Sequence, residues 1–315
     1  MISGKRVVEK ILELKVVALA ITLSKKLVLP GFDGLPLYNV TFFFIKGLQK
    51  GYITSRASAI SFNFFLAVFP SLIFLFTIIP FVPIENFQVS LLILIHDFLP
   101  GKAYETVKDT VEEIITRPNG GLLSVGFILT LYFATNGINS LMEAFNSTFH
   151  TIETRSWFQQ RLISTALVLI LSILLIIAIG LMTFGTALLN FLAPDWILTT
   201  TFYLILIRIS QWMIILGTLF FAISFIYYLA PAKRRHFRFI SAGSSLATVL
   251  IILTTLGFNF YVDNFSKYNL LYGSIGTLMI VLLWIYFNAF SLLIGFELNA
   301  SIYNAKREEK SAVYI

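Results

Sequence analysis

Six long apolar stretches, separated by short polar segments, set the pattern of this chain. They cover about 57–82, 122–147, 162–192, 202–229, 239–261 and 272–300. A helix needs about 20 mostly apolar residues to cross the hydrocarbon core of a bilayer, and each stretch reaches that length. The pattern therefore predicts an all-α fold, a polytopic membrane helix bundle with six transmembrane helices.

The first 50 residues follow a weaker pattern. Residues 11–29 are apolar but are interrupted by charged side chains, which are Glu13, Lys15, Lys25 and Lys26. We interpret this segment as an amphipathic helix on the inner leaflet, where anionic lipids attract lysine. A seventh span is the alternative interpretation. Turn-forming residues at 30–36 separate it from a second amphipathic segment at about 37–50.

These patterns divide the chain into three expected parts. They are an amphipathic extension on the cytoplasmic side over 1–50, a six-helix transmembrane domain over 51–305 and a cytoplasmic tail over 306–315. The loop at 84–121 is the only sizeable external piece. Within it, residues 102–117 have apolar positions at helical spacing and carboxylates on the other face, which predicts a short amphipathic helix at the outer surface.

Composition and charge agree with a membrane chain and orient it. The 315 residues are 57% hydrophobic and 12% charged, whereas soluble domains are about 25% charged. Eighteen Lys and Arg residues lie before span one, between spans two and three, between spans four and five, or after span six; only four lie in the other loops. Because Lys and Arg collect on the cytoplasmic side, this split predicts that both termini are cytoplasmic.

Span two carries a polar stripe in its inner half. Its members lie at offsets of 0, 3, 7 and 10, which places them on one helical face: Asn136, Asn139, Glu143 and Asn146. One interpretation is the lining of a hydrated cavity or substrate site. The other is hydrogen bonding between helices, which often joins membrane bundles. Glu143 makes the stripe costlier than amides alone, because a mid-helix charge costs about 2.5–3.5 kcal/mol on insertion scales.

Other polar residues lie inside the remaining spans. Span six has a small and polar face formed by Asn288, Ser291, Gly295 and Asn299, with Glu297 off that face near the cytoplasmic end. Span one has Asn63 in its inner half and Pro70 near its middle, where the missing N–H frees a carbonyl and favours a kink. Arg208, in the outer part of span four, is a candidate contact for an anion or a lipid headgroup, or it snorkels to the interface.

Several kinds of chemistry are not indicated. The chain has no cysteine, and its histidines, His96, His150 and His236, match no metal-binding spacing. No GxxxxGK[ST] phosphate loop and no GxSxG nucleophile motif occur. The basic run at 232–238 is explained by loop topology rather than by nucleic acid. We therefore expect a protein that is not an enzyme, has no cofactor or metal, and has the lipid bilayer as its partner.

Three segments carry a family pattern. They are RASAISFNFFLAVFPSLIFL (56–75), LAPAKRRHFRFISAGSSLAT (229–248) and FNFYVDNFSKYNLLYGSIGTLMIVLLWIYFNAFSLLIGFELNA (258–300). The last has a YGS-x-G start, an LLW-x-Y centre and a G-x-ELNA end. Over residues 40–305 the chain resembles the YihY/virulence factor BrkB family of bacterial inner-membrane proteins, historically mislabelled as ribonuclease BN. The resemblance implies six helices, cytoplasmic termini and a transporter-like or lipid-handling role in the bacterial plasma membrane.

Our leading hypothesis is a membrane transporter that does not use ATP. It would export a small polar solute or translocate a lipid, and an inner-facing cavity would be lined by Asn63, Asn136, Asn139, Glu143, Asn288 and Glu297, with Pro70 at a flexible point. Glu143 and Glu297 are the first candidates for a proton-coupled step. The alternatives are a membrane scaffold, in which the polar stripes only join helices, and a membrane-associated ribonuclease, which would need a metal cluster.

Overall fold

The computed structural model describes residues 15–81, 118–148, 155–192, 201–232, 238–265 and 268–313. The helices in these ranges are α2 (Lys15–Lys26), α3 (Leu37–Lys50), α4 (Ile53–Ile78), α7 (Gly120–Thr148), α8 (Trp157–Leu192), α10 (Thr201–Leu229), α11 (Ala242–Phe265) and α12 (Tyr268–Val313). A single 3-10 turn, Ile79–Phe81, follows α4. The helix predicted at 102–117 lies outside the described residues, as does the first part of the helix predicted at 11–29.

Six of these helices are long and apolar enough to cross a membrane. They are α4, α7, α8, α10, α11 and α12. This confirms the all-α fold with six candidate spans. The side of the membrane on which the termini lie stays a prediction. Five of these helices are longer than the predicted spans, and α4 has the same length but begins and ends four residues earlier. The largest difference is in α12, because its polar end at 301–313 continues the helix beyond the apolar stretch.

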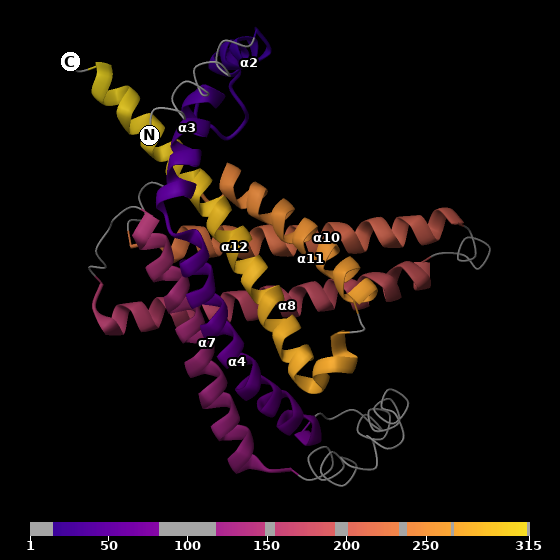
Figure 1. Ribbon diagram of the computed structural model, residues 1–315. Coiled ribbons are helices and arrows are strands. Elements are labelled where there is room, and N and C mark those ends of the chain that lie inside the picture. Colours follow the sequence, from indigo (N-terminus) through magenta and orange to yellow (C-terminus); the bar gives the residue numbers. More distant parts are fainter. Residues whose placement is uncertain are drawn as a thin grey trace.

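The helices form two groups that cross (Figure 1). α4 and α7 run antiparallel and side by side, and α12 packs along α4. α8 and α10 form a second pair that crosses the first at a steep angle, and α11 lies between α10 and α12. Helix α12 therefore contacts elements from both ends of the sequence, including α3, α4 and α11.

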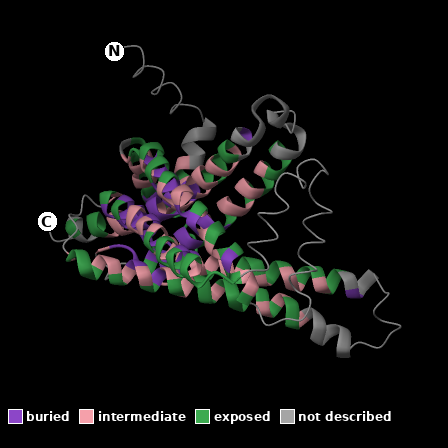
Figure 2. Cartoon of the chain, turned by 90° about the horizontal axis from the view of Figure 1, so that it is seen from below, coloured by how far each residue is buried: buried purple, intermediate pink, exposed green. Residues whose placement is uncertain are grey.

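The core lies where these groups cross, and Figure 2 shows the buried residues gathered in the middle of the bundle. Three aromatic rings meet there, from α7, α10 and α12. Phe145 stacks on Phe296 with 4.0 Å between ring centroids, and Tyr227 meets both edge-on at 5.6 and 5.5 Å. Each aromatic pair contributes about 0.5–1.5 kcal/mol beyond area burial. The rings thus fix α7, α10 and α12 relative to one another.

Small residues bring α11 and α12 into backbone contact. A Cβ added at Gly243 would collide with the carbonyl oxygen of Gly295. The N–H of Gly243 donates to Asn299 Oδ1 at 2.9 Å, and Asn299 Nδ2 donates to Ser241 Oγ at 2.9 Å. Glycine at such crossings permits the close approach that drives helix association in membranes. The small and polar face predicted on span six therefore faces α11 at this end.

The segment before α4 packs on the far end of α12. Its apolar side chains share a small second core with α12, formed by Phe32, Leu35, Val40, Ile302 and Ala305. Asp33 lies at the tip of the turn with a positive φ of 55°. It accepts from Lys306 Nζ at 2.7 Å and lies 3.0 Å from Arg238 Nη2. The expected extension and the expected tail are thus in contact, and α3 has the bounds predicted for the second amphipathic segment.

Candidate functional site

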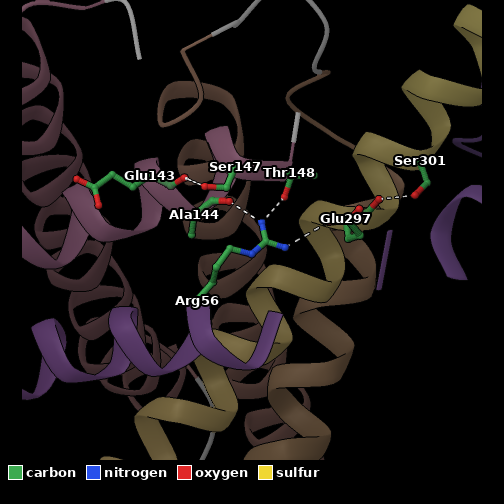
Figure 3. Close-up of polar contacts among 7 residues, drawn as sticks. All are labelled: Arg56, Glu143, Ala144, Ser147, Thr148, Glu297 and Ser301. Atoms are coloured by element: carbon green, nitrogen blue, oxygen red, sulfur yellow. Dashed lines mark hydrogen bonds and ion pairs between the residues drawn. The ribbon is translucent and has the colours of Figure 1, made fainter. Parts of the chain in front are cut away.

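An arginine and a glutamate form a buried ion pair at the end of the bundle covered by α3. Arg56 Nη2 lies 3.7 Å from Glu297 Oε2, and the two side chains are 11% and 7% exposed. Arg56 Nη1 donates to the carbonyl of Ala144 at 2.7 Å and to Thr148 Oγ1 at 2.6 Å (Figure 3). One guanidinium therefore joins α4, the last turns of α7, and α12.

Two glycines leave the space for this pair. A Cβ at Gly47 of α3 would collide with Glu297 Oε1, and a Cβ at Gly51, directly after α3, would lie 2.8 Å from Arg56 Nη2. Their spacing of four residues places both on the same side of α3. Helix α3 can therefore lie directly over the two charged groups and shield them from solvent.

The ion pair links two segments that carry the family pattern. Arg56 opens the first segment, and Glu297 lies in the ELNA end of the third. Glu297 was predicted as a site residue, whereas Arg56 was counted only as a flanking charge. The sequence does offer one indication of Arg56, which is the pair Gly47 and Gly51 just before it. Small residues on an amphipathic helix indicate that another segment packs closely against that helix.

Three of the four residues in the polar stripe predicted on span two bond to other parts of the bundle, and two of these contact α8. Asn139 Oδ1 accepts a hydrogen bond from Ser164 Oγ. Asn136 Oδ1 accepts from Arg161 Nη1 at 2.8 Å. Asn146 is buried and accepts from a backbone N–H just after α10 at 3.0 Å. These contacts correspond to the alternative of hydrogen bonding between helices.

Glu143 differs from the asparagines because it lies on the outside of the bundle. Its side chain is exposed, and Figure 3 shows its carboxylate directed away from the ion pair of Arg56 and Glu297. Other polar residues share its face of α7 at offsets of 0, 4, 8, 11 and 15. We call this set the α7 strip: Tyr132, Asn136, Ser140, Glu143 and Ser147. Three of them are exposed, and Asn136 and Ser140 are half-buried.

The α7 strip has a neighbouring helix on each side. Asn63 of α4 donates to Ser140 Oγ at 2.7 Å and to the carbonyl of Ala59 at 3.0 Å. Arg161 of α8 binds Asn136 as described above. The strip therefore runs along the outer surface of a candidate membrane span, with polar side chains of α4 and α8 beside it.

The other predicted residues lie apart from the strip. Pro70 is buried within α4, which continues as one helix through it. Asn288 donates to the carbonyl of Trp284 in its own helix at 2.7 Å. Arg208 is exposed on α10. The polar faces of spans two and six thus contact different neighbours, and a role of these residues in transport stays a prediction.

Two cavities of the described chain lie elsewhere. One, of about 510 Å³, opens between α11 and α12 and is mostly apolar, and it is lined by Leu253, Thr254, Gly257, Phe258, Tyr261, Leu283 and Phe287. The other, of about 320 Å³, lies between α3 and the end of α12 and is lined by Tyr38, Asn39, Phe42, Phe43, Ala305, Glu308 and Glu309. Neither is lined by a predicted transport residue.

The residues that the structure describes bring together no group of three or more His, Cys, Asp or Glu side chains that could hold an ion. The carboxylates at 105–113, which the ribonuclease hypothesis would use, lie outside the described residues.

Comparison with known proteins gives one family and several relatives. The family model described as virulence factor BrkB matches residues 44–313. The protein YfkH of Bacillus subtilis, named ribonuclease-like, is 30% identical over 253 residues, which cover 80% of this chain and 91% of YfkH. A UPF0761 membrane protein of Aggregatibacter aphrophilus is 25% identical over 273 residues, 84% of this chain and 92% of that protein. No solved structure matches.

Proposed function

This chain belongs to the virulence factor BrkB family, and from the placement of its polar residues we propose that it translocates lipids across the bacterial inner membrane without ATP. Of the two substrates considered for transport, a lipid suits the geometry better than a small polar solute. A solute needs a polar path enclosed by the bundle, whereas the α7 strip lies on its outer surface. A lipid can pass its headgroup along such a surface while its chains stay in the bilayer.

The observation that carries this proposal is the exposed Glu143 within a candidate membrane span. A charge inside a membrane span is costly, by up to about 2.5–3.5 kcal/mol at mid-helix on insertion scales, and intramembrane charges usually face protein or water. A membrane helix that keeps a carboxylate and a serine on its lipid side therefore draws water or headgroups into the bilayer. Such a path lowers the barrier to headgroup crossing and needs no nucleotide.

The ion pair of Arg56 and Glu297 has a supporting role in this proposal. It fixes the last turns of α7 against α4 and α12, and Glu143 lies in those turns. The ion pair thereby keeps α7 from turning about its own axis. This matters because successive residues of a helix are about 100° apart, so a turn by one residue would move the strip from the outer surface into the bundle.

Replacing Glu143 by leucine tests the function directly. Purified protein is placed in vesicles with a headgroup-labelled fluorescent phospholipid, and a reductant that cannot cross the membrane bleaches the outer leaflet. We expect Glu143→Leu to slow the loss of inner-leaflet fluorescence about tenfold, because it removes the charge that keeps the path hydrated. The unfolding temperature should not fall, since the side chain is exposed.

Glu308→Leu is the matched control, because it removes an exposed carboxylate at the polar end of α12. It should translocate lipid at the wild-type rate. Equal rates for wild type and Glu143→Leu, or no lipid translocation by the wild type above protein-free vesicles, would contradict the proposal. Release of a trapped small polar solute by the wild type would favour the exporter instead.

A membrane scaffold is the second candidate function. It is favoured by the interhelical hydrogen bonds of Asn63, Asn136 and Asn139, which the bundle uses to join α4, α7 and α8. In that case the exposed α7 strip would bind another protein rather than lipid headgroups. The wild type would then show no lipid translocation in vesicles.

A further inference from the structure

Arg161 is a polar residue beside the α7 strip that the proposed function does not yet use. It lies in the first turns of α8 and is half-buried. Its Nη1 donates to Thr135 Oγ1 at 2.7 Å and to Asn136 Oδ1 at 2.8 Å. Because both acceptors belong to α7, these bonds hold the guanidinium at a fixed place beside the strip.

Two aromatic rings flank the same guanidinium. Its central carbon lies 5.0 Å from the ring centroid of Tyr132 and 5.8 Å from that of Trp157. A cation within about 6 Å of a ring centroid is attracted by the ring, and more strongly where water is excluded. Trp157 is 72% exposed, so the rings restrain Arg161 while leaving the site open to the surroundings of the bundle.

The remaining donors of Arg161 are available to a ligand. An arginine has five N–H groups in a planar fork. Within the described residues, the hydrogen bonds of Arg161 involve Nη1 alone, which leaves the Nε and Nη2 edge. That edge offers two parallel N–H donors, with which arginine binds phosphate or carboxylate in a bidentate pair.

We propose that Arg161 binds the phosphate of a phospholipid headgroup beside the α7 strip. This rests on the proposed function and assigns a substrate class to it, namely lipids that carry a phosphate. The four groups around it, Tyr132, Thr135, Asn136 and Trp157, restrain the guanidinium before the lipid arrives. Glu143 lies two helical turns from Asn136, about 10 Å along α7. A phosphate at Arg161 is therefore attracted without direct contact with that carboxylate.

Trp157 provides a reporter next to the site. A variant that keeps Trp157 as the only tryptophan (Trp196→Phe, Trp212→Phe and Trp284→Phe) is placed in nanodiscs with a lipid whose chains are brominated, since bromine quenches nearby tryptophan. Brominated phosphatidylglycerol carries the phosphate, and a brominated galactosyl diglyceride does not. We expect half-maximal quenching at a mole fraction several-fold lower for phosphatidylglycerol, because a bidentate arginine contact favours it.

Three substitutions separate the arginine from general effects. Arg161→Gln should abolish the preference for phosphatidylglycerol, and Arg161→Lys should keep part of it, since a lysine binds phosphate as a point charge. Arg307→Gln, which changes an exposed arginine at the end of α12, should keep the full preference. Equal quenching of the reporter protein with Arg161 intact by the two lipids would overturn the proposal, whatever the variants do.

The source of the phosphate is tested separately with inorganic phosphate. If a lipid headgroup occupies the site, added inorganic phosphate leaves the preference in place. Loss of the preference would assign the site to the free ion and overturn the lipid proposal. Failure of the proposed function can be told apart from failure of this inference. A phosphate preference without lipid translocation would make Arg161 a lipid-binding site in a protein that does not translocate lipids. Lipid translocation without the preference would refute the Arg161 inference alone.

Discussion

Replacing Glu297 by alanine is expected to destabilise the protein by about 3 kcal/mol or more. The substitution leaves the Arg56 guanidinium buried without its carboxylate partner, and breaking a buried ion pair costs about 3–5 kcal/mol. The hydrogen bonds of Arg56 to Ala144 and Thr148 remain and keep the charge in place. The measurement is the free energy of unfolding of the purified protein in mixed detergent micelles, titrated with a denaturing detergent.

The double variant Arg56→Leu with Glu297→Leu makes this test specific. Replacing both charges by apolar side chains of similar volume is often neutral or stabilising, so the double variant should recover most of the loss. Glu308→Ala, at an exposed carboxylate of the same helix, should change stability by less than about 0.5 kcal/mol. If Glu297→Ala were as stable as Glu308→Ala, the pair would not form in the protein.

Gly243→Ala is expected to separate α11 from α12. The new Cβ would collide with the carbonyl oxygen of Gly295 and would lie 2.5 Å from Asn299 Cγ. Neither the backbone of α12 nor the hydrogen-bonded Asn299 can move without loss of other contacts, so we expect a cost of about 2–3 kcal/mol. The readout is the unfolding temperature together with the yield of folded protein.

Gly257→Ala is the matched control, because it makes the same change on the same helix. A Cβ at Gly257 meets no atom within 4 Å, and alanine favours a helix over glycine by about 1 kcal/mol. This variant should be as stable as the wild type or more so. A Gly243→Ala variant as stable as Gly257→Ala would show that the two backbones are not in contact.

The helices could be predicted from the sequence because membrane spans depend on local properties. The six spans were predicted from the length and apolarity of each stretch alone. The amphipathic pattern of residues 37–50 predicted α3 with the observed bounds. The far end of α12 was not predicted to be helical. Its residues at 301–313 are polar enough to lie outside a membrane, yet they continue the helix and pack on the segment before α4.

The site could be predicted only in part, since periodicity places residues on one face without saying what that face meets. Asn136 and Glu143 were correctly placed together on α7, but one contacts α8 and the other is exposed. The partner of Glu297 is 241 residues away in sequence, and no local pattern connects them. Arg56 therefore looked like one of many basic residues before span one.

Helix α12 is long enough to join the helix bundle to the segment before α4. The stretch Leu278–Glu309 alone has 32 residues and extends about 48 Å, more than the roughly 40–45 Å of a whole bilayer. Near its C-terminal end, Lys306 donates a hydrogen bond to Asp33. Within the bundle, Gly295 of the same helix contacts Gly243 of α11. Helix α12 therefore joins the contact around Asp33 to the glycine crossing through one continuous backbone, and Glu297 lies between these two points. A displacement of the segment before α4 would reach the ion pair of Arg56 and Glu297 through α12.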